Sequence, residues 1–123
     1  MVFLLALAAL VGAYLANKWM LKFFRENAVI FGAPIVEELF KTLPAYFLNH
    51  FLFGLGEALY DFFTGRRKTG AGAAAAGLIS HTLFGVLTDW IRKGTGWILP
   101  ALAGAAFAHC VWNFTVMRAG RRN

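Results

Sequence analysis

The sequence predicts an all-α, polytopic membrane helix bundle. Of its 123 residues, 59% are hydrophobic and only 15% are charged, which leaves more apolar surface than a soluble domain of this size can bury. The apolar residues form long runs separated by short basic clusters, as in membrane proteins. The formal net charge of +6 therefore indicates membrane orientation and no nucleic-acid partner. The single cysteine, Cys110, excludes an internal disulfide.

Five apolar segments predict about five transmembrane or half-membrane helices. The first covers residues 2–16 and extends towards 21, and it lacks the basic start of a signal peptide. The others are residues 28–48, 51–63, 71–91 and 97–117. The third of the five has 13 residues, fewer than the roughly 20 that span a bilayer, so we expect a short or tilted helix there.

The basic residues predict how the chain is oriented. With the amino terminus outside, segments 18–25, 66–68 and 118–122 face the cytoplasm and hold nine of the twelve Lys and Arg residues. The outward segments hold only Arg92 and Lys93. Because cytoplasmic loops are enriched in Lys and Arg, an N-out, C-in topology is predicted, in what we expect to be a prokaryotic cytoplasmic membrane.

The length allows one domain. We expect a single transmembrane domain over residues 1–123, made of a first helix and cytoplasmic loop (1–26), a core with the candidate site (27–117) and a basic cytoplasmic tail (118–123).

Ionisable and polar side chains interrupt the apolar segments. An ionisable group at the bilayer centre costs about 3 kcal/mol or more, so such groups are rare unless they are paired or functional. A helix rise of about 1.5 Å per residue puts side chains from four segments near the midplane, which predicts that they converge on one water-accessible site. They are Glu37, Glu38, Lys41, Glu57, His81, His109 and Asn113.

Helical spacing groups several of these side chains. Glu37 and Lys41 are four residues apart, as are His109 and Asn113, so each pair shares a helix face. The last two segments contain runs rich in Gly and Ala, which allow helices to pack closely. We therefore expect His81 and His109 to lie near one another.

Two prolines and a polar pair mark the second segment. Pro34 and Pro44 bracket the two glutamates, and each lacks a backbone donor and can kink the helix. Asn49 and His50 follow this segment and are predicted to face outward between helices. On this interpretation His50 is a surface residue without a functional role.

The order of these motifs resembles that of the PrsW-like and CPBP (CAAX protease and bacteriocin-processing) superfamily of glutamic-type intramembrane proteases. That superfamily has a paired-glutamate motif, a later His on its own helix, and a final His-x-x-x-Asn. Residues 33–41 are similar to the Glu-Glu-x-x-Lys form of the PrsW branch, since Thr42 stands where the CPBP branch has Arg. The other similar segments are 54–60 (with Ala58 where an Asn usually follows the Glu), 80–85 and 108–113.

The resemblance covers residues 28–114 and implies an activity. The protein is then an intramembrane endopeptidase that cleaves membrane-embedded or membrane-proximal segments with a glutamate-activated water and no cofactor. Glu37 is implied to be the base, His81 to position the water, and His109 with Asn113 to form the oxyanion hole. The implied catalytic residues are Glu37, Glu38, His81, His109 and Asn113, supported by Lys41 and Glu57. The expected partners are the lipid bilayer and a membrane protein or peptide substrate, with a homo-oligomer left open.

Two other classes of function fit the same residues. Glu37, His81 and His109 form a plausible zinc-ligand set with water at the open position, which predicts a zinc-dependent intramembrane protease. A non-enzymatic alternative is a shortened relative that acts as a membrane scaffold, an immunity-type protein or a small proton-coupled carrier. Taken singly, Glu37 with Lys41 also fits a structural ion pair, and Asn113 fits a hydrogen bond between helices.

Overall fold

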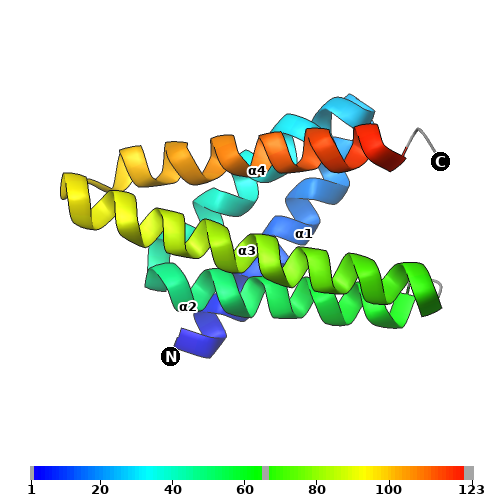
Figure 1. Ribbon diagram of the computed structural model, residues 1–123, viewed down its shortest axis with the longest axis horizontal. Coiled ribbons are helices and arrows are strands. Elements are labelled where there is room, and N and C mark those ends of the chain that lie inside the picture. The colour runs from blue at the N-terminus through cyan, green and yellow to red at the C-terminus, as the bar shows by residue number, and fades with distance from the viewer. Residues whose placement is uncertain (1, 65–66, 121–123) are drawn as a thin grey trace.

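The computed structural model describes residues 2–64 and 67–120, and these form an all-α bundle (Figure 1). The predicted fold class is confirmed. Helices α2 and α3 lie side by side, and α4 runs along α3 (Figure 1). Residues 66, 121 and 122 of the predicted basic segments lie outside the described residues. In chain order the elements are α1 (Val2–Asn27), the π-helical turn η1 (Ala28–Gly32), α2 (Ala33–Thr64), α3 (Arg67–Thr95) and α4 (Ile98–Gly120).

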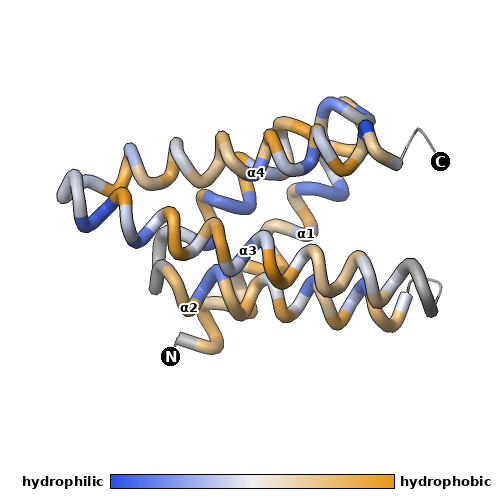
Figure 2. Tube along the Cα trace, viewed as in Figure 1, coloured by the Kyte–Doolittle hydropathy of each residue, from blue (hydrophilic) through white to orange (hydrophobic). Residues whose placement is uncertain are grey.

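The bundle is a membrane protein by the length and composition of its helices. Figure 2 shows apolar residues along most of each helix, with hydrophilic residues near helix ends and within the bundle. Among the described residues, three segments are long and apolar enough to cross a membrane: Phe3–Arg25, Gly70–Thr95 and Ile98–Gly120.

Burial is inverted relative to a soluble protein. Glu38 and Lys41 are fully buried, whereas Phe63 and Phe107 expose 78% and 73% of their surface. Soluble proteins almost never bury Lys and Glu completely while leaving many large apolar side chains outside. Lipid as the outer solvent explains both observations, because hydrocarbon accepts Phe and excludes charge.

The end of α1 redirects the chain toward the site. Arg25 has φ 49° and ψ −126°, a backbone conformation that interrupts the helix. The π-helical turn η1 follows at residues 28–32 and leads directly into α2. This change of direction brings the diglutamate segment against α1.

Helix α2 covers the second predicted segment from residue 33 onward and all of the third, and it is sharply bent between them (Figure 1). The Asn49 side-chain nitrogen donates to the carbonyls of Phe40 (3.1 Å) and Lys41 (2.6 Å). In a straight helix, residues eight apart are separated by about 12 Å. Pro44 has no N–H, so it leaves the Phe40 carbonyl without its helical partner, and Asn49 supplies the missing donor. We call residues 33–42 the first arm and residues 49–64 the second arm.

The bend corrects one prediction. His50 was expected to be a surface residue between helices, but it is 0% exposed, and the neighbouring Asn49 is 1% exposed. The polar pair lies inside the bundle because the chain folds back on itself there instead of forming a surface connection. The interpretation of His50 as a surface residue is therefore wrong.

A tight turn joins α3 to α4. Gly96 has φ +74°, and its N–H donates to the Arg92 carbonyl at 2.8 Å, as in a helix C-cap. The turn makes α3 and α4 antiparallel neighbours, and His81 and His109 lie at similar chain distances on either side of it. This hairpin places the two imidazoles at one level of the bundle.

Candidate active site

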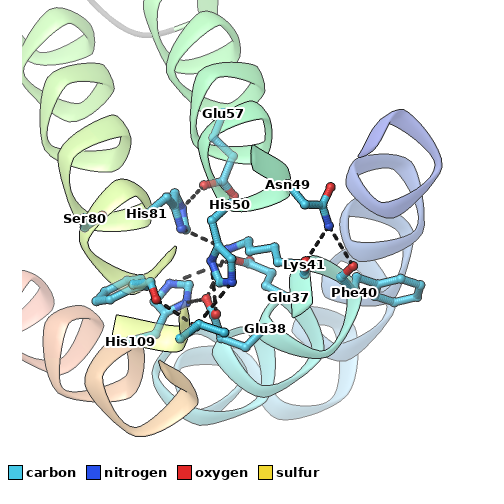
Figure 3. A network of polar contacts seen from close by, with 12 residues as sticks. Glu37, Glu38, Phe40, Lys41, Asn49, His50, Glu57, Ser80, His81 and His109 are labelled. Carbon is cyan, nitrogen blue, oxygen red and sulfur yellow. Dashed lines mark hydrogen bonds and ion pairs between the residues drawn. The ribbon is translucent and has the colours of Figure 1, made fainter. Parts of the chain in front are cut away.

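Charged and imidazole side chains from α2, α3 and α4 meet in the interior (Figure 3). The Lys41 ammonium lies 3.1 Å from Glu37 Oε2, 3.4 Å from Glu38 Oε1 and 2.9 Å from His81 Nδ1. It also lies 4.0 Å from the centroid of the Phe53 ring, a cation–π distance. A fully buried ammonium needs such partners to offset its lost hydration. We call Glu37, Glu38, Lys41, His81 and His109 the buried cluster.

His81 is held at both ring nitrogens. A Lys ammonium only donates hydrogen bonds, so His81 Nδ1 accepts from Lys41. The ring hydrogen then lies on Nε2, which donates to Glu57 Oε2. Glycine at residue 54 lets α2 and α3 approach this closely, because a Cβ at residue 54 would lie 2.8 Å from the His81 Cβ. The two contacts fix the tautomer and the orientation of His81.

His109 is oriented by the second glutamate. Its Nδ1 lies 2.9 Å from Glu38 Oε1, and because a carboxylate only accepts, Nδ1 carries the hydrogen. In a neutral ring, the free lone pair is then on Nε2, which lies 3.8 Å from Glu37 Oε2. The centroids of the His81 and His109 rings are 5.1 Å apart. The expected proximity of the two histidines is therefore confirmed.

Helix α1 contributes a residue that sequence analysis missed. The Asn17 side-chain nitrogen donates to Glu37 Oε1 at 2.6 Å, so donors hold both oxygens of Glu37. In the sequence, Asn17 is a lone carboxamide where the first apolar segment extends from residue 16 towards residue 21. The available signal was its chemistry, because a carboxamide inside an apolar helix needs a hydrogen-bonding partner.

A cavity of about 770 Å³ opens beside the buried cluster, and we call it the site cavity. Glu37, Glu57, Asn17 and Asn113 lie in its wall, whereas His81 and His109 are behind this wall and nearly fully buried. Glu37 thus belongs both to the buried cluster and to the cavity wall. The rest of the lining is mainly apolar and aromatic: Leu10, Val11, Tyr14, Leu21, Ala28, Val29, Ala33, Phe53, Gly56 and Tyr60, together with Asp61.

Asn113 is positioned by the π-helical turn. Its side-chain nitrogen donates to the Val29 carbonyl at 2.9 Å. An amide nitrogen carries two hydrogens, so one donor remains for a group in the site cavity. The predicted neighbour on the same helix face, His109, directs its own hydrogen to Glu38 instead.

The expected zinc ligands gather, but the cluster already contains a cation. Ligand atoms of Glu37, His81 and His109 all lie within 4.8 Å of one another. Zinc bonds to nitrogen and oxygen are about 2.0–2.2 Å long. The Lys41 ammonium is 3.1 Å from Glu37 Oε2 and 2.9 Å from His81 Nδ1, so it occupies the place of a cation between these ligands. In this arrangement the residues do not fit a metal unless Lys41 moves away.

The fold and the site together define a helical membrane protein with a buried carboxylate–imidazole cluster beside a cavity. No protein-family model matches the chain, and no match was found among curated proteins or among solved structures.

Proposed function

We propose that this protein is an intramembrane endopeptidase of the glutamic type, acting on membrane-embedded or membrane-proximal protein segments. The observation that carries the proposal is the position of Glu37. Its carboxylate contacts the fully buried Lys41 and also lines a cavity of about 770 Å³. A general base at membrane depth needs this combination of fixed geometry and access to water.

The proposed reaction begins with a water molecule that passes from the site cavity to a position between Glu37 and His109. Glu37 Oε2 and His109 Nε2 are both acceptors, and their separation of 3.8 Å allows one water molecule to donate to both. Glu37 takes a proton from this water, and the water oxygen bonds to the peptide carbonyl carbon. The second N–H of Asn113 donates to the oxyanion that forms. When the C–N bond breaks, the Glu37 proton passes to the leaving nitrogen, which yields a carboxylic acid and an amine.

The remaining residues support this chemistry. Lys41 holds the carboxylates of Glu37 and Glu38 in place, and Glu38 holds His109. His81 connects Lys41 to Glu57 at the cavity wall. The order of the motifs supports the PrsW branch of the superfamily, and with it a prokaryotic cytoplasmic membrane.

Cleavage of model substrates tests the proposal. Purified protein in lipid vesicles is incubated with single-span peptides that carry a fluorophore and a quencher on opposite sides of the apolar segment. We expect Glu37→Gln to lower the cleavage rate by a factor on the order of 10² or more, because it keeps the shape but removes the proton acceptor. Asp89→Asn is the matched control, since Asp89 pairs with the exposed Lys93 outside the cluster, and it should retain the wild-type rate.

The same assay separates the two alternative classes. A zinc-dependent protease loses activity with a strong chelator, whereas the glutamate mechanism predicts an unchanged rate. A scaffold, immunity-type protein or carrier cleaves none of the peptides in its wild-type form. An unchanged rate in folded Glu37→Gln protein would contradict the glutamate mechanism directly.

A further inference from the structure

A fully buried imidazole outside the proposed catalytic set contacts the buried cluster. His50 is 0% exposed, and its Nδ1 lies 3.4 Å from Glu38 Oε2 (Figure 3). Its Nε2 lies 3.5 Å from the Thr88 hydroxyl. Placing an ionisable side chain at such a position in a membrane protein is costly unless the side chain has a partner or a function.

The fold builds this contact from two sides. The bend of α2 returns residue 50 to the level of residue 38, although a straight helix would separate them by about 18 Å. On the α3 side, a Cβ at Gly85 would lie 2.8 Å from the His50 Cβ, so only glycine leaves room for the ring in this position. His50 is thus placed against Glu38 by the backbone of both helices.

Glu38 connects His50 to the proposed reaction centre. Its Oε1 accepts from His109 Nδ1 at 2.9 Å, and its Oε2 faces His50. Neither Glu38 Oε2 nor His50 Nδ1 has a hydrogen-bond partner among the described residues, so their separation of 3.4 Å is an ion-pair contact and not a formed hydrogen bond. Because a carboxylate only accepts, His50 can hold Glu38 Oε2 only in a form with a hydrogen on Nδ1. The final torsion of a Glu side chain is soft, so a contact at each oxygen determines where the carboxylate points.

We propose that His50 is a positioning residue that acts through Glu38. By holding Oε2, it keeps Oε1 on His109 Nδ1 and so keeps the His109 Nε2 lone pair facing Glu37. In many enzymes, residues that contact the hydrogen-bond partner of an imidazole help to fix its tautomer. The effect on cleavage rests on the proposed function, whereas the effect on the His109 tautomer does not.

Two nearly isosteric substitutions test whether His50 positions Glu38 through Nδ1 or through Nε2. In His50→Asn the amide nitrogen takes the place of Nδ1, and in His50→Gln it takes the place of Nε2. We expect His50→Asn to keep kcat within about threefold of wild type, and His50→Gln to lower kcat about tenfold or more with KM unchanged. Loss of packing alone would affect both variants alike. Thr88→Val removes the contact at Nε2 and should leave kcat close to the wild-type value.

Imidazole ¹⁵N spectra of histidine-labelled protein in lipid give a readout that needs no substrate. We expect the Nδ1–H tautomer of His109 in wild type and His50→Asn, and a tautomer mixture in His50→Gln. An unchanged His109 tautomer in folded His50→Gln overturns the inference, whether or not the protein cleaves peptides. The wild-type spectrum tests the inference even if both variants unfold, because a His50 ring without hydrogen on Nδ1 also overturns the positioning role. If wild-type protein cleaves nothing, the proposed function fails while the spectra still test the positioning role.

Discussion

Lys41 places a positive charge where neither water nor lipid headgroups reach it. Three acceptors surround its ammonium, and two of them are the carboxylates of Glu37 and Glu38. Removing one partner of a buried ion pair is far more costly than removing both, because the remaining charge stays buried without compensation. The stability of the bundle therefore depends on this one side chain more than on any exposed ion pair.

Lys41→Met tests this dependence at a single residue. The substitution keeps the approximate length of the side chain but leaves two buried carboxylates without their cation. We expect a loss of about 3–5 kcal/mol in the free energy of unfolding, measured by circular dichroism in detergent. Lys93→Met is the control, because Lys93 is 75% exposed and its ion pair with Asp89 contributes at most about 1 kcal/mol. Equal stability of the two variants would contradict the assigned role of Lys41.

The cluster residues could be predicted from the sequence, whereas His50 could not. Glu37, His81 and His109 interrupt apolar runs, and the high cost of such groups in lipid marks them as paired or functional. His50 stands between two apolar runs, where a surface connection and a buried bend have the same pattern. Only the hydrogen bonds from Asn49 to carbonyls eight and nine residues earlier distinguish the two.

At the scale of helices, the bend of α2 determines the shape of the site. It sets the first arm, which carries the diglutamate, across the second arm, which carries His50 and Glu57. Pro44 opens the backbone ladder, and Asn49 closes it again with its side chain. A backbone carbonyl left without a partner in a buried position costs about 1–3 kcal/mol. The bend is therefore stable only while Asn49 supplies its donor.

Asn49→Leu tests the role of this side chain in the bend. Leucine has a similar volume but no donor, so the carbonyls of Phe40 and Lys41 lose their partner. We expect a loss of about 1–3 kcal/mol in the free energy of unfolding, measured by denaturation in detergent. Asn27→Leu is the matched control, because Asn27 is exposed and caps no helix with its side chain. A stability equal to that of Asn27→Leu would show that the bend does not need Asn49.

The helices themselves followed from hydropathy, but their contacts with the site did not. Apolar runs predicted the helices because lipid demands satisfied backbone groups. The contribution of α1 depends on the turn at Arg25 and on the π-helical turn at residues 28–32, which no periodicity indicates. Without that change of direction, the Asn17 side chain would not reach Glu37.

At the scale of the whole molecule, the positions of the helix ends agree with the topology predicted from the basic residues. The carboxyl end of α2, the amino end of α3 and the carboxyl end of α4 lie on one side of the bundle, with the end of α1 towards the same side (Figure 1). These ends adjoin the segments predicted to face the cytoplasm. The turn between α3 and α4 lies at the opposite side (Figure 1), and it contains the exposed Trp97. Trp is enriched at membrane–water interfaces, so this side fits a membrane surface.

Cysteine labelling tests the predicted N-out, C-in topology. Cys110→Ser first removes the only native thiol, and single cysteines then replace Thr64 and Thr95. These threonines are matched because both are exposed, near a helix end and uncharged, so neither substitution changes the charge bias. We expect a membrane-impermeant maleimide to label Thr95→Cys in intact cells, and to label Thr64→Cys only after the membrane is opened. Segments rich in Lys and Arg stay on the cytoplasmic side of the membrane. The reverse labelling pattern would therefore overturn the predicted orientation.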